Sequence, residues 1–213
     1  MVSVVRLEMR WRDLLFLHRE VDPATLNLPE GLEPDLFEGR AYQGHVPFRM
    51  EGVRPVGCPG IRRLSDFPET NLRTYVRLNG VPYVWFHRLE TPNRTANALA
   101  RNFFGLPYET APVGVSVADG RVTYSGGAIL GERGVLVATP GAEVAGDAFD
   151  RWCVQRDTFL VRHRGAWRIG RVHHAPYRLR EVRVEGEIAF SHERAIFCDG
   201  VDVRADAITK LKP

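Results

Sequence analysis

The segment from Glu69 to Ala111 carries most of the side chains in this sequence that could act together in a chemical reaction. They are carboxylates, guanidiniums, phenols and one amide: Glu69, Asn71, Arg73, Tyr75, Arg101, Tyr108 and Glu109. A carboxylate can transfer a proton, a phenol can donate a hydrogen bond to a substrate oxygen, and a guanidinium can bind both oxygens of a carboxylate. The segment therefore predicts a polar site for a small molecule, but it does not identify that molecule.

A strand that begins near Glu69 must position the first of these side chains. Alternation along a strand directs Asn71, Arg73, Tyr75 and Arg77 to one face. The other face then carries Leu72, Thr74, Val76 and Leu78. The polar face is either solvated or lines a polar cavity, and both interpretations remain open. If it lines a cavity, Arg73 or Arg101 is the expected clamp for an anion.

Tyr108 and Glu109 are candidates for the reacting centre. Removing the phenol proton at pH 7 costs about 4 kcal/mol, so Tyr108 is expected to donate a hydrogen bond rather than act as a nucleophile. Glu109, like Glu69, becomes a general base if burial raises its pKa. Neighbouring strand residues point to opposite faces, so both enter one cavity only if the chain bends near Pro107. Alternatively, Tyr108 fills the interior and Glu109 pairs with an arginine outside.

Turn and cap signals predict the elements that hold these residues. Asn79-Gly80 predicts a hairpin between strands at 72–78 and 81–89, and further hairpins are predicted at Asp119-Gly120 and Arg164-Gly165. A helix is predicted from a cap at Thr91 to Gly105, and a second begins at Asp147. Many short strands with two or so short helices indicate the α+β class and a closed or nearly closed, mostly antiparallel β-barrel. No compositional break divides the chain, so residues 1–213 are predicted to form one domain.

The cationic residues exclude one branch of chemistry. Of 29 lysines and arginines only Lys210 and Lys212 are lysine, and both lie in the last four residues. Schiff-base catalysis, pyridoxal phosphate attachment and a phosphate-loop lysine all need a lysine inside a folded site. No cofactor is therefore predicted. The net charge of +3 comes with mixed signs along the chain, which argues against nucleic-acid binding.

Cysteine and histidine spacing argues against a metal site. Cys58, Cys153 and Cys198 are scattered, which favours a reducing cytoplasm over a disulfide framework. His173 and His174 are adjacent and would diverge on a strand, so no metal is predicted. No run approaches the ~20 apolar residues of a membrane-spanning helix, so no membrane association is predicted. Cys153 is expected to be buried in the second helix.

The order of several motifs resembles the YqjF-like family of the acetoacetate decarboxylase-like superfamily. The motifs are ETNLRTYV, GVPYVWF, ALARNFFGLPYETA, DRWCV and RVHHAPYRL. The resemblance implies a cone-shaped β-barrel whose interior holds a small-molecule site. It also implies a role for His174, because HAPY is similar to the family's His-x-Pro-Trp signature, with Tyr177 in place of tryptophan.

Comparison with acetoacetate decarboxylase itself narrows the reactions that the site is expected to perform. Tyr108 and Glu109 fall in the slots of its two adjacent lysines, and Glu69 falls about where it has an active-site glutamate. Decarboxylation through an imine is therefore not expected. The sequence also departs from the family pattern at YSGGA, which begins at Tyr124, because relatives tend to carry an arginine there.

Three hypotheses follow for function. The first is a cytoplasmic barrel that binds a small organic acid or carbonyl compound, with lysine-independent acid–base catalysis of the lyase or hydrolase type as one option. The second is a non-catalytic ligand-binding or sensing module that uses the same cavity. The third is an interaction protein with a solidly packed barrel. Asn71, Arg73, Tyr75, Arg101 and His174 would bind the ligand, Glu69, Tyr108 and Glu109 would carry catalysis, and a homo-oligomer is compatible with each hypothesis.

Overall fold

The computed structural model describes residues 5–60 and 65–211. The strands are β1 (Val5–Val21), β2 (Glu33–Pro34), β3 (Ala41–Pro55), β4 (Phe67–Leu78), β5 (Val81–Thr91), β6 (Tyr108–Thr110), β7 (Gly114–Ala118), β8 (Arg121–Ser125), β9 (Val135–Val144), β10 (Thr158–His163), β11 (Ala166–His173), β12 (Leu179–Glu187), β13 (Arg194–Asp206) and β14 (Thr209–Lys210). The helical segments are η1 (Pro23–Thr25), α2 (Arg94–Leu99), η2 (Ala100–Phe104), α3 (Gly127–Leu130) and α4 (Ala148–Val154).

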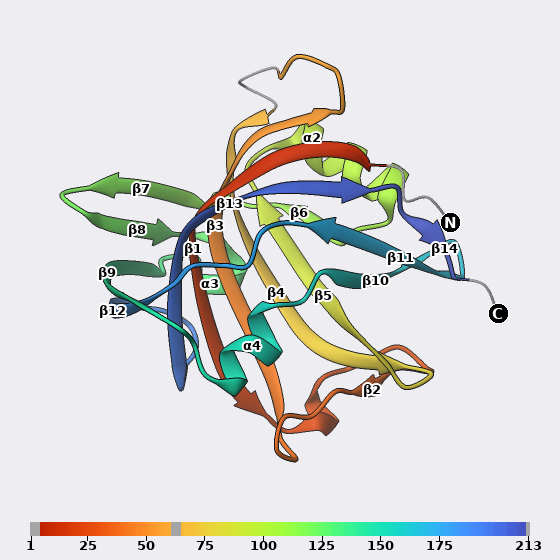
Figure 1. Cartoon of the computed structure of the whole chain (residues 1–213), viewed down its shortest axis with the longest axis horizontal. Helices are drawn as coiled ribbons and strands as arrows, with labels where there is room; N and C mark the ends of the chain where they lie inside the picture. The colour runs from red at the N-terminus through yellow and green to blue at the C-terminus, as the bar shows by residue number, and fades with distance from the viewer. Residues whose placement is uncertain (1–4, 61–64, 212–213) are drawn as a thin grey trace.

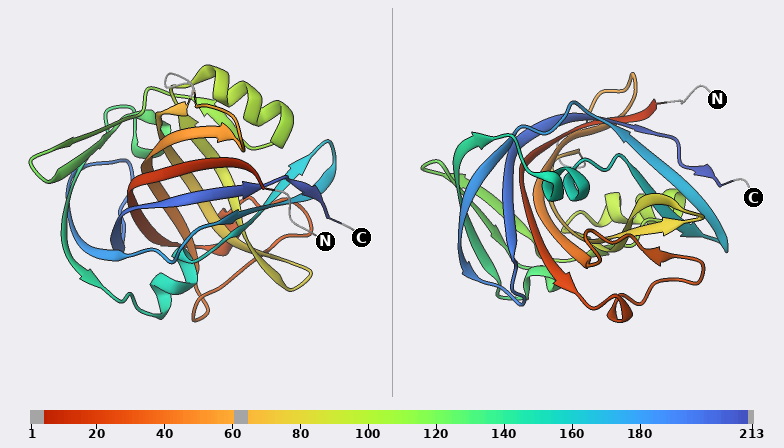
Figure 2. Two further views of the ribbon diagram at one scale, coloured as in Figure 1. Left: turned by 45° about the horizontal axis from the view of Figure 1, so that its top comes forward. Right: turned by 60° about the horizontal axis from the view of Figure 1, so that its bottom comes forward.

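The strands close into a ring, as predicted for a mostly antiparallel barrel. Pairing runs β11–β10–β5–β4–β3–β1–β13, and β13 pairs again with β11 through Val172 with Ala205 and His173 with Arg204. The N-terminal part of β13 instead pairs with β12, through Phe197 and Arg180. β13 therefore pairs with β11 near its C-terminal end and with β12 near its N-terminal end. The sheet branches at β13, and β12, β9, β8 and β7 continue beside the ring (Figures 1 and 2).

The long strands β1 and β13 each contain a residue with positive φ where they bend. Asp13 has φ 52° and Gly200 has φ 153°, and Arg12 lies opposite Gly200 in the register of the two strands. Beyond this point the side-chain alternation changes phase. On β1, Met9 belongs to the interior cluster before the bend, and Leu14 and Phe16 belong to it after the bend. Both halves of the strand therefore contribute apolar side chains to the barrel interior.

A second apolar cluster joins the ring to the branch. Leu15 and Leu17 point away from the interior and pack with Tyr124, Leu130 and Leu136. A third cluster on the outside of β4 and β5 contains Val76, Leu78 and Tyr83. The predicted alternation of the strand at 69–78 is confirmed, because Tyr75 lies in the interior cluster whereas Val76 and Leu78 lie in the outer one.

The predicted turns are confirmed by their backbone angles. Asn79 and Gly80 have φ of 51° and 76° between β4 and β5, as a two-residue hairpin of the primed type requires. Asp119-Gly120 joins β7 to β8, and Arg164-Gly165 joins β10 to β11 in the same way. These dipeptides tolerate positive φ, so the sequence alone was enough to locate them.

Both predicted helices are present, but the first differs from the prediction in where it begins and in its last turn. α4 begins after Asp147 as predicted, with a capping box that Asp147 and Asp150 form. The first helix starts two residues later than predicted, because Asn93 rather than Thr91 caps it and accepts from the backbone N–H of Ala96. It then widens into the π-helical turn η2 before ending at Gly105, as predicted, with φ 71°. The short helix α3 was not predicted from the sequence.

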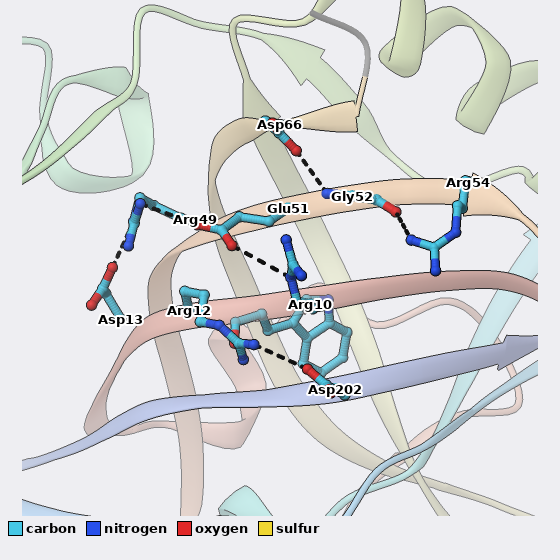
Figure 3. Close-up of polar contacts among 10 residues, drawn as sticks. Arg10, Arg12, Asp13, Arg49, Glu51, Gly52, Arg54, Asp66 and Asp202 are labelled. Carbon is cyan, nitrogen blue, oxygen red and sulfur yellow. Dashed lines mark hydrogen bonds and ion pairs between the residues drawn. The ribbon is translucent and has the colours of Figure 1, made fainter. Parts of the chain in front are cut away.

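The outer face of β13, β1 and β3 carries a ladder of ion pairs (Figure 3). Arg12 pairs with Asp202 at 3.0 Å across β1 and β13. Arg49 pairs with Asp13 at 2.6 Å across β3 and β1, beside the bend. These residues alternate with Met9 and Trp11, which face inward, so the same strands present charge to solvent and hydrocarbon to the interior. In the described part of the chain, no helix has both the length and the apolar character needed to cross a membrane.

Candidate functional site

The barrel interior contains a cavity of about 500 Å³. Most of its wall is apolar, with Trp11, Phe48, Phe86 and Phe159 among the aromatic side chains. Strand β4 contributes a row of polar side chains to the wall: Glu69, Asn71 and Arg73. Their spacing of two residues places all three on the inward face of one strand. The polar face of this strand therefore lines a cavity, which answers the question that alternation left open.

Strand register gives the depth of each polar group in the cavity. Arg73 lies opposite Gly44, Asn71 opposite Val46 and Glu69 opposite Phe48 on β3. Further along β3, Val53 and Pro55 line the cavity where β3 pairs with the start of β1. Pro55 is exposed, whereas Gly44 and Val46 are buried. Arg73 is therefore at the deep end, and Glu69 lies between it and the mouth.

Glu69 and Tyr108 meet in the cavity. The Tyr108 hydroxyl donates a hydrogen bond to Oε2 of Glu69 over 2.7 Å. Burial raises the pKa of Glu69 to about 7, although the hydrogen bond from Tyr108 opposes that rise. The pKa of Tyr108 is well above its usual value because the phenol is buried and faces the Glu69 carboxylate. Near neutral pH the pair therefore holds a carboxyl group that can exist in either protonation state beside a phenol that stays protonated.

Arg73 is a buried guanidinium with little of its donor capacity used. Only 8% of the residue is exposed, and Nη2 donates to the backbone oxygen of Cys153 over 3.2 Å. Its Nε is buried without a hydrogen-bond partner, and within the described residues Arg73 forms no ion pair. The guanidinium also lies near the ring of Phe16, 5.5 Å from its centroid.

Four titratable groups near Arg73 are neutral near pH 7: His18, Cys153, Tyr75 and Tyr177. Burial, and then the charge of Arg73, lowers the pKa of His18 well below its usual value. Burial raises the pKa of the Cys153 thiol to about 12 and also raises the pKa values of Tyr75 and Tyr177. None of these groups carries a negative charge near neutral pH, so none of them compensates the guanidinium.

A close packing arrangement fixes this end of the cavity. His18 Nε2 and the Tyr75 hydroxyl are 2.6 Å apart. A Cβ at Gly44 would lie 3.0 Å from His18 Nε2, 3.2 Å from the Tyr75 hydroxyl and 3.3 Å from Cγ of Arg73. A residue without a side chain at position 44 therefore lets β1 and β4 bring these three groups together. The ring of Tyr75 packs against the guanidinium of Arg73, and Tyr75 does not itself line the cavity.

Asn71 lies between the two charged centres. The residue is 6% exposed, and its Oδ1 has no hydrogen-bond partner in the part of the chain that the structure describes. Because amide oxygen and nitrogen are assigned from their surroundings, the side chain can offer either a donor or an acceptor to a molecule in the cavity.

Besides Tyr75, three further predicted site residues do not line the cavity. Glu109 is exposed and pairs with Arg88 at 3.2 Å, because β6 runs regularly beside β5 and turns it away from Tyr108. Arg101 is exposed and donates to the backbone oxygen of Tyr108 over 2.9 Å. His174 bonds the backbone oxygen of Ala175 over 2.7 Å, and its ring packs against Tyr177. Together with Tyr75, these three are the predicted site residues that the structure does not bring to the cavity wall.

Several residues at the site were not predicted from the sequence. Arg156 lines the cavity, but Asp35 neutralises it at 2.8 Å. His18 and Tyr177 belong to the surroundings of Arg73, and Trp11 belongs to the wall. A signal for Trp11 existed in the period-two pattern of β1, whereas His18 follows the change of phase at Asp13, which nothing in its neighbourhood predicts.

The cavity wall reaches the surface beneath α2 and η2. Thr95 and Leu99 line the cavity and are exposed, and 51% of Leu99 is accessible. Phe104 of η2 lines it as well. Figure 1 shows α2 at the end of the ring where β4 begins and β5 ends. Among residues 5–60 and 65–211, no group of three or more histidine, cysteine, aspartate or glutamate side chains could hold a metal ion.

Comparisons with known proteins place this chain in a family. Residues 8–202 match the DUF2071 family model, described as an uncharacterized conserved protein. The chain is 30% identical over 188 residues to the uncharacterized protein YqjF of Bacillus subtilis, covering 84% of this chain and 77% of that protein.

Solved structures show the same fold at low sequence identity. An acetoacetate decarboxylase from Legionella pneumophila aligns with a TM-score of 0.69 at 13% identity, covering 98% of this chain and 88% of the other. The enduracididine biosynthesis enzyme MppR, complexed with pyruvate, aligns with a TM-score of 0.58 at 13% identity, covering 98% and 90%. With the motifs and the closed ring of strands, these matches make the chain a YqjF-like member of the DUF2071 family, with the acetoacetate decarboxylase-like fold.

Proposed function

We propose that the cavity binds a small organic acid or carbonyl compound, and that Glu69 and Tyr108 exchange a proton with it. The observation that carries the proposal is the uncompensated guanidinium of Arg73, which is buried in the cavity wall with Nε unpartnered. A buried charge without a counter-ion is costly, and an anion bound beside it offsets that cost. Nε and one terminal nitrogen of arginine together fit the two oxygens of a carboxylate.

Glu69 is suited to proton transfer. A general base works best when its pKa lies near the operating pH, and burial brings the pKa of Glu69 to about 7. With a carbonyl ligand, Glu69 removes a proton from the carbon beside the carbonyl group, and the electron pair of the C–H bond forms the enolate. Tyr108 donates a hydrogen bond to the enolate oxygen, and Glu69 then returns the proton.

The step needs no lysine. Within the described residues the single lysine is Lys210, which is exposed in β14 and does not line the cavity. The resemblance of the ALARNFFGLPYETA motif to the decarboxylase implies that its two lysines correspond to Tyr108 and to the exposed Glu109. The fold relative MppR was solved with pyruvate, which supports a keto acid as a ligand class for a cavity in this fold.

Ligand-induced stabilisation tests the binding step. A panel of carboxylates and keto acids should include compounds that raise the melting temperature by several degrees, because a ligand at 100 times its Kd adds about 2.7 kcal/mol. Arg73→Gln should abolish this shift. If no carboxylate or keto acid shifts the melting temperature of the wild-type protein, the proposal is wrong.

Exchange of ligand protons for deuterium tests the chemical step. The carbon beside the carbonyl of a bound keto acid should exchange in D₂O, as NMR would record. Glu69→Gln should slow the exchange by roughly 10²-fold or more. Glu109→Gln is the matched control, because it removes an exposed carboxylate beside the same tyrosine.

A non-catalytic binding module is the second candidate. It is favoured by the hydrogen bond that already joins Tyr108 to Glu69, since both groups have a partner before any ligand enters. This candidate predicts binding without deuterium exchange, and equal affinities for the wild type and Glu69→Gln.

A further inference from the structure

We infer that the ligand of this site is an acid with a bulky apolar body, either an aryl group or a medium-length aliphatic chain, whose carboxylate lies against Arg73 at the deep end. The inference rests on the proposed function, because it uses the same cavity and the same guanidinium. It adds the size and polarity of the ligand, which the proposed function leaves open.

The positions of the polar groups argue against a very small acid. Arg73 and Glu69 are four residues apart on one strand, which separates their Cα atoms by roughly 13 Å. The charge of Arg73 is not among the causes that shift the pKa of Glu69. An acid of two to four carbons placed on Arg73 therefore leaves Glu69 and the rest of the cavity unfilled.

The wall between Arg73 and the mouth is suited to hydrocarbon. Phe16 and Val46 surround the deep end, and Met9, Trp11 and Phe48 follow toward the mouth. A volume of about 500 Å³ lies within the range of pockets that enclose ligands much larger than a keto acid of three carbons. Burying an apolar chain against these side chains supplies binding energy that a small acid cannot gain.

The mouth accommodates the far end of such a ligand. Leu7 and Val53 line it from the sheet, and Leu99 lines it from α2. Leu99 is an apolar side chain with 51% of its area exposed, so a ligand tail that emerges there gives it an apolar contact. An unpaired guanidinium at the closed end and a mostly apolar wall toward the exit, with Asn71 and Glu69 as its polar side chains on β4, match an acid that enters with its carboxylate first.

A homologous series of straight-chain acids tests the inference. Calorimetric titration with the acids from butanoate to dodecanoate should show affinity rising about four-fold for each added methylene until the cavity is full. The primary alcohols of the same lengths should bind roughly ten-fold more weakly or worse, because they lack the charge that Arg73 receives. Phenylalkanoates should follow the longer acids rather than the short ones.

Three variants separate the contribution of the ligand's carboxylate from that of its apolar chain. Arg73→Gln should remove the preference for acid over alcohol, whereas Arg54→Gln, which removes a charge at the mouth, should keep it. Val53→Trp narrows the mouth without touching Arg73, so it should weaken binding of the long acids and leave butanoate unchanged.

Equal affinity for short and long acids, or for an acid and its alcohol, would overturn the inference. If keto acids whose carbonyl group reaches Glu69 still bind and exchange protons in that case, the proposed function stands while the ligand class is wrong. If no acid of any length binds to the wild-type protein, both fail together.

Discussion

At the scale of single residues, burial decides what each titratable group can do. Glu69 and Glu109 are the same residue type, but Glu69 is 3% exposed with a raised pKa, whereas Glu109 faces solvent beside Arg88. His18 is buried and held neutral by burial and by Arg73. Among the described residues of the cavity wall, Arg73 is therefore the charged group without an ion-pair partner, and Glu69 is a carboxyl group that titrates near neutrality.

The raised pKa of Glu69 predicts a pH-dependent stability. Its pKa of about 7 in the folded protein lies above the reference value of 4.5, so the contribution of Glu69 is fully present below pH 4.5 and is lost as pH rises toward 7. The loss should be about 3 kcal/mol, at about 1.4 kcal/mol per pH unit. Urea unfolding of the wild type and Glu69→Gln across this range should show the wild type falling relative to the variant, then levelling off above pH 7.

The comparison with Glu69→Gln removes an opposing effect. Burial lowers the pKa of His45 to about 3, so that histidine stabilises the folded protein above pH 6.5 and loses its contribution as pH falls. Both proteins contain His45, and the difference between them isolates Glu69. A constant difference from pH 4.5 to 8 would show that Glu69 titrates normally.

At the scale of elements, the first helix matters because it covers the cavity and ends abruptly. The widened turn η2 places Phe104 on the cavity wall, and Gly105 then reverses the chain toward Tyr108. A π-helical turn rotates the residues after it, which is one reason such turns occur at functional sites. The chain between Gly105 and β6 is short, so the position of Tyr108 depends on this ending.

Glycine-to-alanine substitutions test how tightly that ending is packed. Gly105 and Gly165 both have positive φ, 71° and 76°, but only Gly105 is crowded, with a Cβ there 2.6 Å from Cβ of His163. Gly165→Ala should cost about 1 kcal/mol of unfolding free energy through backbone strain alone. Gly105→Ala should cost about 2–4 kcal/mol because overpacking adds to that strain. Equal losses in urea unfolding would contradict the packing described here.

At the scale of the whole molecule, the ring and its branch differ in how they are supported. β1 pairs with β3 on one side and β13 on the other, and its Leu15 and Leu17 are fully buried. β7 is the last strand of the branch, and Val117 on it is 51% exposed. The ring that encloses the cavity is therefore the better supported part of the fold.

Hydrogen exchange should reveal this difference. Amides of β7 and β8 are expected to exchange through local opening at a small fraction of the global unfolding free energy, whereas amides at Leu14–Leu17 should exchange only on global unfolding. Native-state exchange followed by NMR or mass spectrometry measures both. Protection of β7 equal to that of β1 would mean that ring and branch unfold as one unit.

The sequence by itself determined the features that depend on local backbone geometry. Asn79-Gly80 set a hairpin, Gly105 ended a helix, Asp147 began one, and alternation placed Glu69, Asn71 and Arg73 on one face. Each follows from the φ angles that a few neighbouring residues allow or from the two-residue period of a strand. The near absence of lysine was equally visible without a structure.

Only the tertiary structure decided which side chains meet. Tyr108 reaches Glu69 across 39 positions of sequence because β6 lies beside β5, and the same pairing turns Glu109 outward. The change of phase at Asp13 in β1 and the extra residue of β5 at His87, opposite Leu72 and Arg73, depend on the closed ring, in which each strand must pair with two neighbours at once. The isolation of the Arg73 charge is likewise a property of its whole surroundings, and no local pattern contains it.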